Sequence, residues 1–301
     1  MHACDVVVLG DYFFDIIITG LKELPRLGAD IFGDSLEMAP GGGYITSVAL
    51  HRLGVHTEWV AHLGNDLLSE FVLRESRREG LCETLFHQYP VPLRKLSVSF
   101  SFPHDRGFIS YIDPFDTSLP LADIAARSPA WLVNPPLSGE VYVQDFLREV
   151  RSLGTKIYLD SQFVDYSLEA DGVTQTLGLT DAFTCNQSEA ACLTGFSDPQ
   201  RAVERLAQFC PLAVVKCGGL GAFAQIGSSQ FFAPGLKVEV VDTTGAGDSF
   251  NAGFLSAFMG GKSVETCLEY GNICGGLSTT KRGGASAAPT SIQLQEILGT
   301  R

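Results

Sequence analysis

Residues 242–250 read Asp-Thr-Thr-Gly-Ala-Gly-Asp-Ser-Phe, and we expect a helix to begin inside this run. Aromatic and leucine side chains recur downstream at helical spacing, at Phe250, Phe254, Leu255 and Phe258. Small residues at 245–247 let backbone N–H groups approach an anion, and the helix dipole adds partial positive charge there. Asp248 could accept a proton from an attacking hydroxyl, but an Asp in a first helical turn also stabilises the helix without any catalytic role. The residues alone leave both interpretations open.

The run 242–253 closely resembles the C-terminal signature of the ribokinase-like, or PfkB, carbohydrate kinases. Further landmarks of that family follow in its usual order along nearly the whole chain: Val6–Gly10 with Asp15, Pro40–Gly42 leading to Val48–Gly54, Leu63–Asp66, Asn186–Glu189 and Lys216–Ala222. The resemblance implies an ATP-dependent enzyme that phosphorylates a hydroxyl of a small neutral acceptor, most directly a sugar. A nucleoside kinase and a non-catalytic protein that senses a sugar or nucleotide are the alternatives.

The resemblance also assigns roles residue by residue. Asp248 would be the catalytic base, and the backbone around Gly245, Ala246 and Gly247 would stabilise charge on the moving phosphoryl group. The acceptor would be bound by Asp15, Gly41, Gly42 and the residue at position 45, which is Ile45. The nucleotide would be bound by Asn186, Lys216, Gly218, Gly221 and Asn272.

The resemblance also implies two bound cations, Mg2+ and K+. Glu189 would hold Mg2+, mostly through water, although Asn186 and Glu189 also have the spacing of a helix cap. Asp242, the carbonyl group of Thr244 and the turn at Gly283 fall where many members bind K+, while Ala287 stands near a position often occupied by a ligating serine.

Lys216 and Ile45 depart from the family pattern, and the role of Arg106 is open. Lys216 replaces the usual Thr or Ser, and it could contact a phosphate or be a solvated strand end. Ile45 replaces an asparagine that contacts the sugar, so we expect an acceptor with an apolar face and poor turnover of ribose. Arg106 is either a cation of the lid described below or an ordinary turn residue.

Apolar strand-like runs alternate with helical patterns along the chain, at Val6–Leu9, Trp59–Leu63, Trp131–Val133, Ile157–Leu159, Ala182–Cys185 and Leu212–Val215. This alternation predicts a doubly wound, mostly parallel α/β sheet flanked by helices. Residues 12–38 and 93–111 read instead as extended segments. By resemblance they form a small β-sheet lid inserted in a single domain spanning residues 1–301, and in several family members such lids pair to make a homodimer.

Composition agrees with an enzyme of this class. The 301 residues are 45% hydrophobic and 18% charged, with a formal net charge of −13, and so acidic a chain argues against nucleic-acid binding. The eight cysteines contain no C-x-x-C pair and are expected to be free thiols. With no evident signal peptide or membrane span, we expect a cytoplasmic location.

Overall fold

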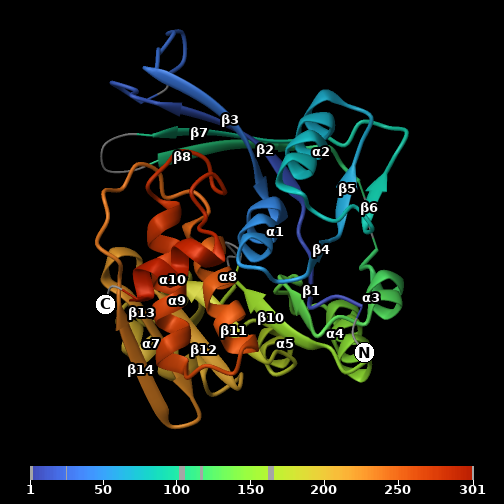
Figure 1. The fold of residues 1–301 in the computed structure, drawn as a ribbon, viewed down its shortest axis with the longest axis vertical. Helices are drawn as coiled ribbons and strands as arrows, with labels where there is room; N and C mark the ends of the chain where they lie inside the picture. Colours follow the sequence, from blue (N-terminus) through green and yellow to red (C-terminus); the bar gives the residue numbers. More distant parts are fainter. Residues whose placement is uncertain (1–2, 25, 102–105, 116–117, 162–165, 300–301) are drawn as a thin grey trace.

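A central sheet of eight strands organises the computed structural model, which describes residues 3–24, 26–101, 106–115, 118–161 and 166–299. Its order is β14-β13-β12-β11-β10-β9-β1-β4 (Figure 1). Neighbouring strands from β12 to β4 pair in parallel, and β13 and β14 complete one edge in antiparallel pairing. The strands are β1 (Val6–Val8), β4 (Thr57–Trp59), β9 (Trp131–Val133), β10 (Lys156–Asp160), β11 (Ala182–Asn186), β12 (Leu212–Lys216), β13 (Gly221–Ile226) and β14 (Ser229–Pro234).

Helices cover both faces of this sheet because its inner strands are apolar on both sides. Val6 and Val8 belong to the core beneath α1 (Gly43–Arg52), α8 (Ala246–Met259) and α9 (Val264–Ser278). Val7 points the other way, into the core beneath α3 (Leu121–Arg127) and α4 (Val141–Ser152). The remaining helices are α2 (Leu67–Glu79), α5 (Val173–Leu177), α6 (Gln187–Thr194), α7 (Pro199–Leu206), α10 (Ser291–Gly299) and the short 3-10 turn η1 (Gly218–Leu220). The predicted doubly wound α/β fold is confirmed.

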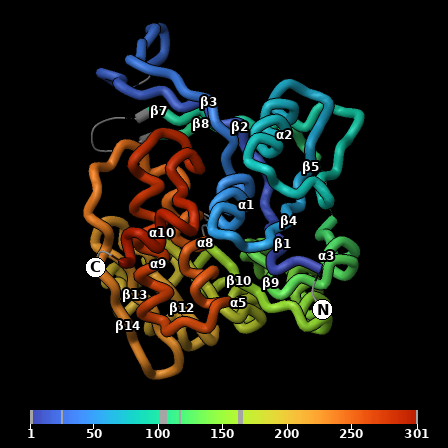
Figure 2. The backbone as a smooth tube through the Cα atoms, viewed as in Figure 1, coloured from blue at the N-terminus to red at the C-terminus, as the bar shows by residue number. Residues whose placement is uncertain are grey.

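A separate sheet of four strands, in the order β3-β2-β7-β8, is built from the two segments predicted to be extended. Its strands are β2 (Tyr12–Thr19), β3 (Ser35–Gly42), β7 (Lys95–Ser101) and β8 (Arg106–Ile112). β2 pairs in parallel with β7, so segments about eighty residues apart lie side by side (Figure 2). Residues 102–105 and the side chain of Arg106 lie outside the described part of the chain, so the interpretation of Arg106 stays a prediction.

One predicted strand is divided in two. The run at 59–63 was expected to be a single strand, but β4 ends at Trp59 and β5 (Ala61–Leu63) pairs with β6 (Phe86–Gln88) in a two-stranded sheet. β4 lies at the edge of the central sheet, next to β1. The chain can therefore leave that sheet after Trp59 without disrupting hydrogen bonds to a second neighbouring strand. Within the described ranges, no helix is both long and apolar enough to cross a membrane.

Candidate active site

The turn that enters α8 is closed around Gly245. α8 begins at Ala246, inside the predicted window, and Gly245 precedes it with φ of +69°. A Cβ atom at Gly245 would lie 2.7 Å from the carbonyl oxygen of Gly284 and 2.8 Å from Cγ2 of Ile45. Both the backbone angle and the space therefore require glycine. The first N–H groups of α8 have no partner inside the helix, which makes this end suited to an anion.

Asp248 lies in the first turn of α8 and is held from another part of the chain. The hydroxyl of Thr46, in α1, donates a hydrogen bond of 2.5 Å to Oδ1 of Asp248. Burial raises the pKa of Asp248 to about 6, and the charge of Asp160 acts in the same direction. The Thr46 hydrogen bond and the charge of Lys216 oppose that rise in pKa. A carboxylate with this pKa is ionised at neutral pH, yet more basic than an exposed aspartate.

Lys216 lies beneath the same turn. Its Nζ forms an ion pair of 2.7 Å with Oδ1 of Asp160 and lies 3.3 Å from where a Cβ atom on Gly247 would be. The side chain of Lys216 is only 11% exposed, so it is not a solvated strand end. Burial alone would lower the pKa of Lys216, but the charge and hydrogen bond of Asp160 outweigh burial and raise it. The structure therefore places a permanent positive charge next to the N-terminus of α8.

A cavity of about 380 Å³ lies in front of these groups. It brings together residues that the sequence analysis assigned to catalysis, nucleotide and metal: Asn186, Glu189, Lys216, Gly218, Gly221, Ala246, Gly247, Asp248 and Asn272. Leu236, Val238 and Val240 supply an apolar part of the wall. A lining that combines charged and polar groups with aliphatic side chains suits a ligand with a charged part and a flat apolar ring.

Asp160 lines this cavity, and the sequence analysis did not single it out. It ends β10 and accepts a hydrogen bond of 2.6 Å from the hydroxyl of Thr184. A signal was present, because a carboxylate directly after a buried parallel strand lies at the edge of the sheet where such folds bind ligands. Thr46 was also missed. Its only signal was a pair of polar residues, Thr46 and Ser47, directly after Ile45 in an otherwise apolar stretch of the helix.

Asn186 and Glu189 form the helix cap that was one of their two interpretations. Oδ1 of Asn186 accepts from the backbone N–H of Glu189 at 2.9 Å, and Oε2 of Glu189 accepts from that of Asn186 at 2.7 Å. Burial raises the pKa of Glu189 to about 7, and the nearby charge of Asp160 contributes. Two carboxylates that face one cavity and repel each other fit a divalent cation with hard oxygen ligands.

Asp242 joins two turns beside the cavity. Its Oδ1 accepts hydrogen bonds from the backbone and hydroxyl groups of Thr244, at 2.9 and 2.7 Å, and its Oδ2 accepts from the N–H of Gly283 at 3.0 Å. The three residues expected at a K+ site are therefore in contact with one another. Asn272 donates to the carbonyl oxygens of Ala233 and Pro234 and so fixes the end of β14, besides lining the cavity.

The residues expected to bind the acceptor lie where β2 and β3 lead into α1. The carboxylate of Asp15 rests against Gly41, where any Cβ atom would overlap it, and Gly42 has φ of +64°. Ile45 is 3% exposed and fills the space over Gly245 and Gly284. It thus supports the turn before Asp248, and its contact with an acceptor stays a prediction.

Comparison with known proteins finds similarity along nearly the whole chain. A 2-dehydro-3-deoxygluconokinase of Bacillus subtilis is 26% identical over 99% of this chain and 96% of its own length. A ribokinase of Arabidopsis thaliana, solved in complex with ribose and ATP, has a TM-score of 0.80 at 22% identity, with 98% of each chain covered. A putative ribokinase II of E. coli, solved with ATP and Mg2+, has a TM-score of 0.79 at 21% identity, covering 99% of this chain and all of that one.

The family model for pfkB family carbohydrate kinases matches residues 125–291, which include β9 to β14, α8, α9 and the turn at Gly245. These residues contribute every group that lines the cavity. This chain therefore belongs to the pfkB family of carbohydrate kinases.

Proposed function

We propose that this carbohydrate kinase transfers the γ-phosphoryl group of ATP to a hydroxyl of a small neutral acceptor, with Asp248 as the base. One observation carries the proposal: Asp248, the N-terminus of α8 and the buried ammonium group of Lys216 converge on one cavity. The acceptor hydroxyl gives its proton to Asp248 while its oxygen bonds to the γ-phosphorus, and the bond from that phosphorus to ADP breaks. The α8 amide groups and Lys216 stabilise the charge on the transferred group.

The nucleotide is proposed to bind with its phosphates at the start of α8 and its base against Leu236, Val238 and Val240. Gly218 supports this orientation, because a Cβ atom there would meet nothing within 4 Å and the backbone faces open space. Mg2+ would offset negative charge on the phosphates and on the carboxylates of Asp160 and Glu189. Since the reaction consumes ATP, we also propose a cytoplasmic location.

The role of Glu189 in metal binding is tested by Glu189→Gln. Glutamine still accepts a hydrogen bond from the N–H of Asn186, so the helix cap survives while the charge is lost. We expect the Mg2+ concentration for half-maximal activity to rise about tenfold, and the thermal midpoint to stay unchanged. Glu204→Gln, on an exposed position of α7, is the matched control. An unchanged Mg2+ titration in Glu189→Gln would leave Glu189 as a helix cap alone.

We also propose that K+ binds at the turn formed by Asp242, Thr244 and Gly283. A bound ion would share the Asp242 oxygens with the donors that already use them. Activity in potassium salts compared with sodium salts tests the site, and higher activity in potassium supports a bound ion.

The proposed acceptor site lies between Asp15, the two glycines and the start of α8. Among the described cations of the small sheet, Lys95 at the start of β7 is paired with Asp11, and Arg94 just before it is paired with Asp113. These pairings support a neutral acceptor. ATP hydrolysis and phosphoryl transfer measured over neutral sugars, phosphosugars and nucleosides test the function. Transfer to a sugar supports the proposal, and transfer only to nucleosides supports a nucleoside kinase. No transfer to any acceptor would point to a protein that senses a sugar or nucleotide.

The small sheet is proposed to be a lid that also pairs two copies of the chain. Register places apolar side chains on one of its faces, in rows such as Met38, Ile16, Val98 and Ile109. Asp15 lies on the opposite face, because side chains alternate along β2. Several side chains of the apolar face are exposed: Leu36, Met38, Ile109 and Tyr111. So large an exposed apolar face is typical of an interface.

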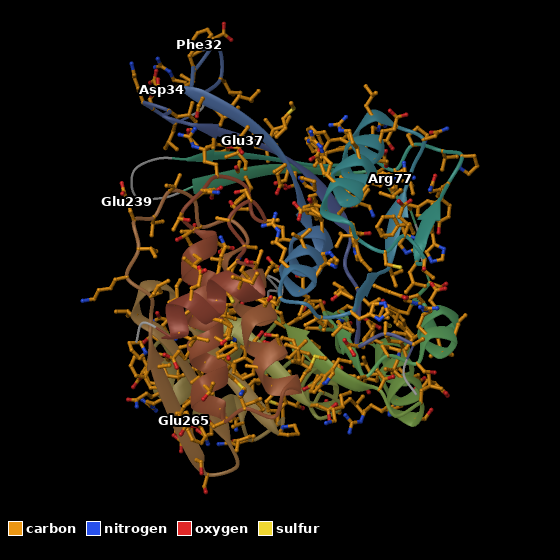
Figure 3. All side chains as sticks on the ribbon, viewed as in Figure 1. Phe32, Asp34, Glu37, Arg77, Glu239 and Glu265 are labelled. Atoms are coloured by element: carbon orange, nitrogen blue, oxygen red, sulfur yellow. The ribbon has the colours of Figure 1, made fainter. Side chains whose placement is uncertain are left out.

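We expect light scattering to give a dimer for the wild type and a monomer for the double variant Met38→Lys with Ile109→Lys. Ser110→Lys, on the opposite face of β8, is the control and should stay dimeric. A wild-type monomer at all concentrations would contradict the proposal. Figure 3 shows Phe32 and Asp34 at the outer tip of the sheet, beyond the rows that would pair.

A further inference from the structure

Thr46 makes an unusual contact for a threonine inside a helix. Serine and threonine side chains in helices commonly bond back to the carbonyl oxygen four residues earlier. Ser47 does this, with its hydroxyl 2.7 Å from the carbonyl oxygen of Gly43. The hydroxyl of Thr46 instead reaches across to Oδ1 of Asp248, 202 residues away in the sequence, and Thr46 is only 1% exposed. The Thr46 side of that hydrogen bond is therefore shielded from solvent.

The direction of this hydrogen bond is fixed by a third residue. Nδ2 of Asn134 lies 3.4 Å from Oγ1 of Thr46, and an amide nitrogen can only donate. Oγ1 of Thr46 therefore accepts from Asn134, and its single proton is directed at Asp248. Asn134 follows β9 with φ of +58°, one of two non-glycine residues with positive φ in the described part of the chain. Such a backbone is strained for most residues and is often kept at functional sites.

We propose that Thr46 is a positioning residue for Asp248, in a chain that runs from Asn134 through Thr46 to one carboxylate oxygen. Because Oδ1 of Asp248 is held by Thr46, the acceptor proton is received by Oδ2. The inference deepens the proposed function and rests on Asp248 being the base. Thr46 also favours the ionised carboxylate, which is the form that accepts a proton.

The charges that face Asp248 act in addition to Thr46. Asp160, at the end of β10, raises the pKa of Asp248, and Lys216, at the end of β12, lowers it. Neither group is changed by a substitution in α1, so a variant of Thr46 isolates the effect of its hydroxyl. Thr46→Val has nearly the same shape and lacks the donor, Thr46→Ser retains it, and Ser47→Ala removes a buried hydroxyl one residue away.

Two measurements test the inference. The pH profile of kcat should rise through about pH 6 in the wild type, and its midpoint should move up by about one pH unit or more in Thr46→Val. Turnover at pH 6 should then fall about fivefold or more, and the difference from the wild type should shrink towards pH 9. Thr46→Ser and Ser47→Ala should keep the wild-type midpoint. The carboxyl carbon of Asp248, assigned by NMR with Asp248→Asn, should show the same shift in its titration without any acceptor.

The outcomes are distinguishable. An unchanged Asp248 titration in a folded Thr46→Val protein would overturn the positioning role, and so would an equal shift in Ser47→Ala. If the wild type transfers no phosphoryl group, the proposed function fails, while the NMR titration still decides whether Thr46 controls Asp248. Circular dichroism and the thermal midpoint show whether each variant is folded.

Discussion

Replacing Asp248 with asparagine is expected to lower turnover by about two to four orders of magnitude, the range expected when a general base is lost. Asparagine can still accept the hydrogen bond from Thr46 through its side-chain oxygen, so the start of α8 should keep its structure. The substitution also removes a carboxylate whose burial is unfavourable. We therefore expect unchanged ATP affinity by calorimetry and an equal or higher thermal midpoint, together with the loss in kcat.

Asp198→Asn is the matched control. Asp198 caps α7 through a hydrogen bond to the N–H of Gln200, and asparagine is an equally good cap. This variant should have normal turnover. If Asp248→Asn were folded and retained turnover within a few-fold of the wild type, Asp248 would not be the base.

Lys216→Met should have the second largest effect. Methionine fills a similar volume without the charge, so the transferred phosphoryl group loses a cation and Asp160 is left without its partner. We expect turnover to fall about 100-fold or more, on the scale seen when one stabilising group of an active site is removed. Loss of the charge partner should also destabilise the fold by about 3 kcal/mol. Chemical denaturation and steady-state kinetics measure the two effects separately.

A double variant separates catalysis from stability. Lys216→Met combined with Asp160→Asn removes both charges and should recover most of the lost stability. Turnover should stay low, because the cation is still missing. Recovery of both stability and turnover in the double variant would show that Lys216 is only the structural partner of Asp160. Lys156→Met, at the exposed start of β10, controls for the loss of a lysine as such.

The fold could be predicted from the sequence where local patterns were strong. α2 and α4 each carry apolar residues at helical spacing on one buried face, and that pattern can be read from the sequence. The sequence did not predict that the run 59–63 is divided between β4 and β5. Strand partners are set by tertiary structure, and β5 pairs with β6 instead of joining the central sheet. Sequence periodicity says where a strand can form, and not which sheet it joins.

The site was predictable where residues lie in one continuous motif. Gly245 to Asp248 could be recognised from the order of small residues and the helix pattern that follows. Thr46 and Asp160 could not, because each acts through a contact with a distant residue, Thr46 with Asp248 and Asp160 with Lys216. From the sequence, Lys216 could equally be a phosphate contact or a solvated strand end. Its side chain is buried and lies against Gly247, which excludes a solvated strand end.

Two of the acidic groups that line the cavity, Asp248 and Glu189, link proton uptake to folding. The pKa of Asp248 is raised from 3.8 to about 6 and that of Glu189 from 4.5 to about 7. Between about pH 4 and pH 7 the folded chain holds protons on these groups that the unfolded chain releases, so their contribution to stability declines as the pH rises through this interval. Burial is the main cause of both shifts, so ionising these groups at neutral pH costs free energy, and a cation bound in the cavity would offset that cost. The free energy of binding such a cation thus includes the relief of that cost, so binding of the cation and stability of the fold are coupled.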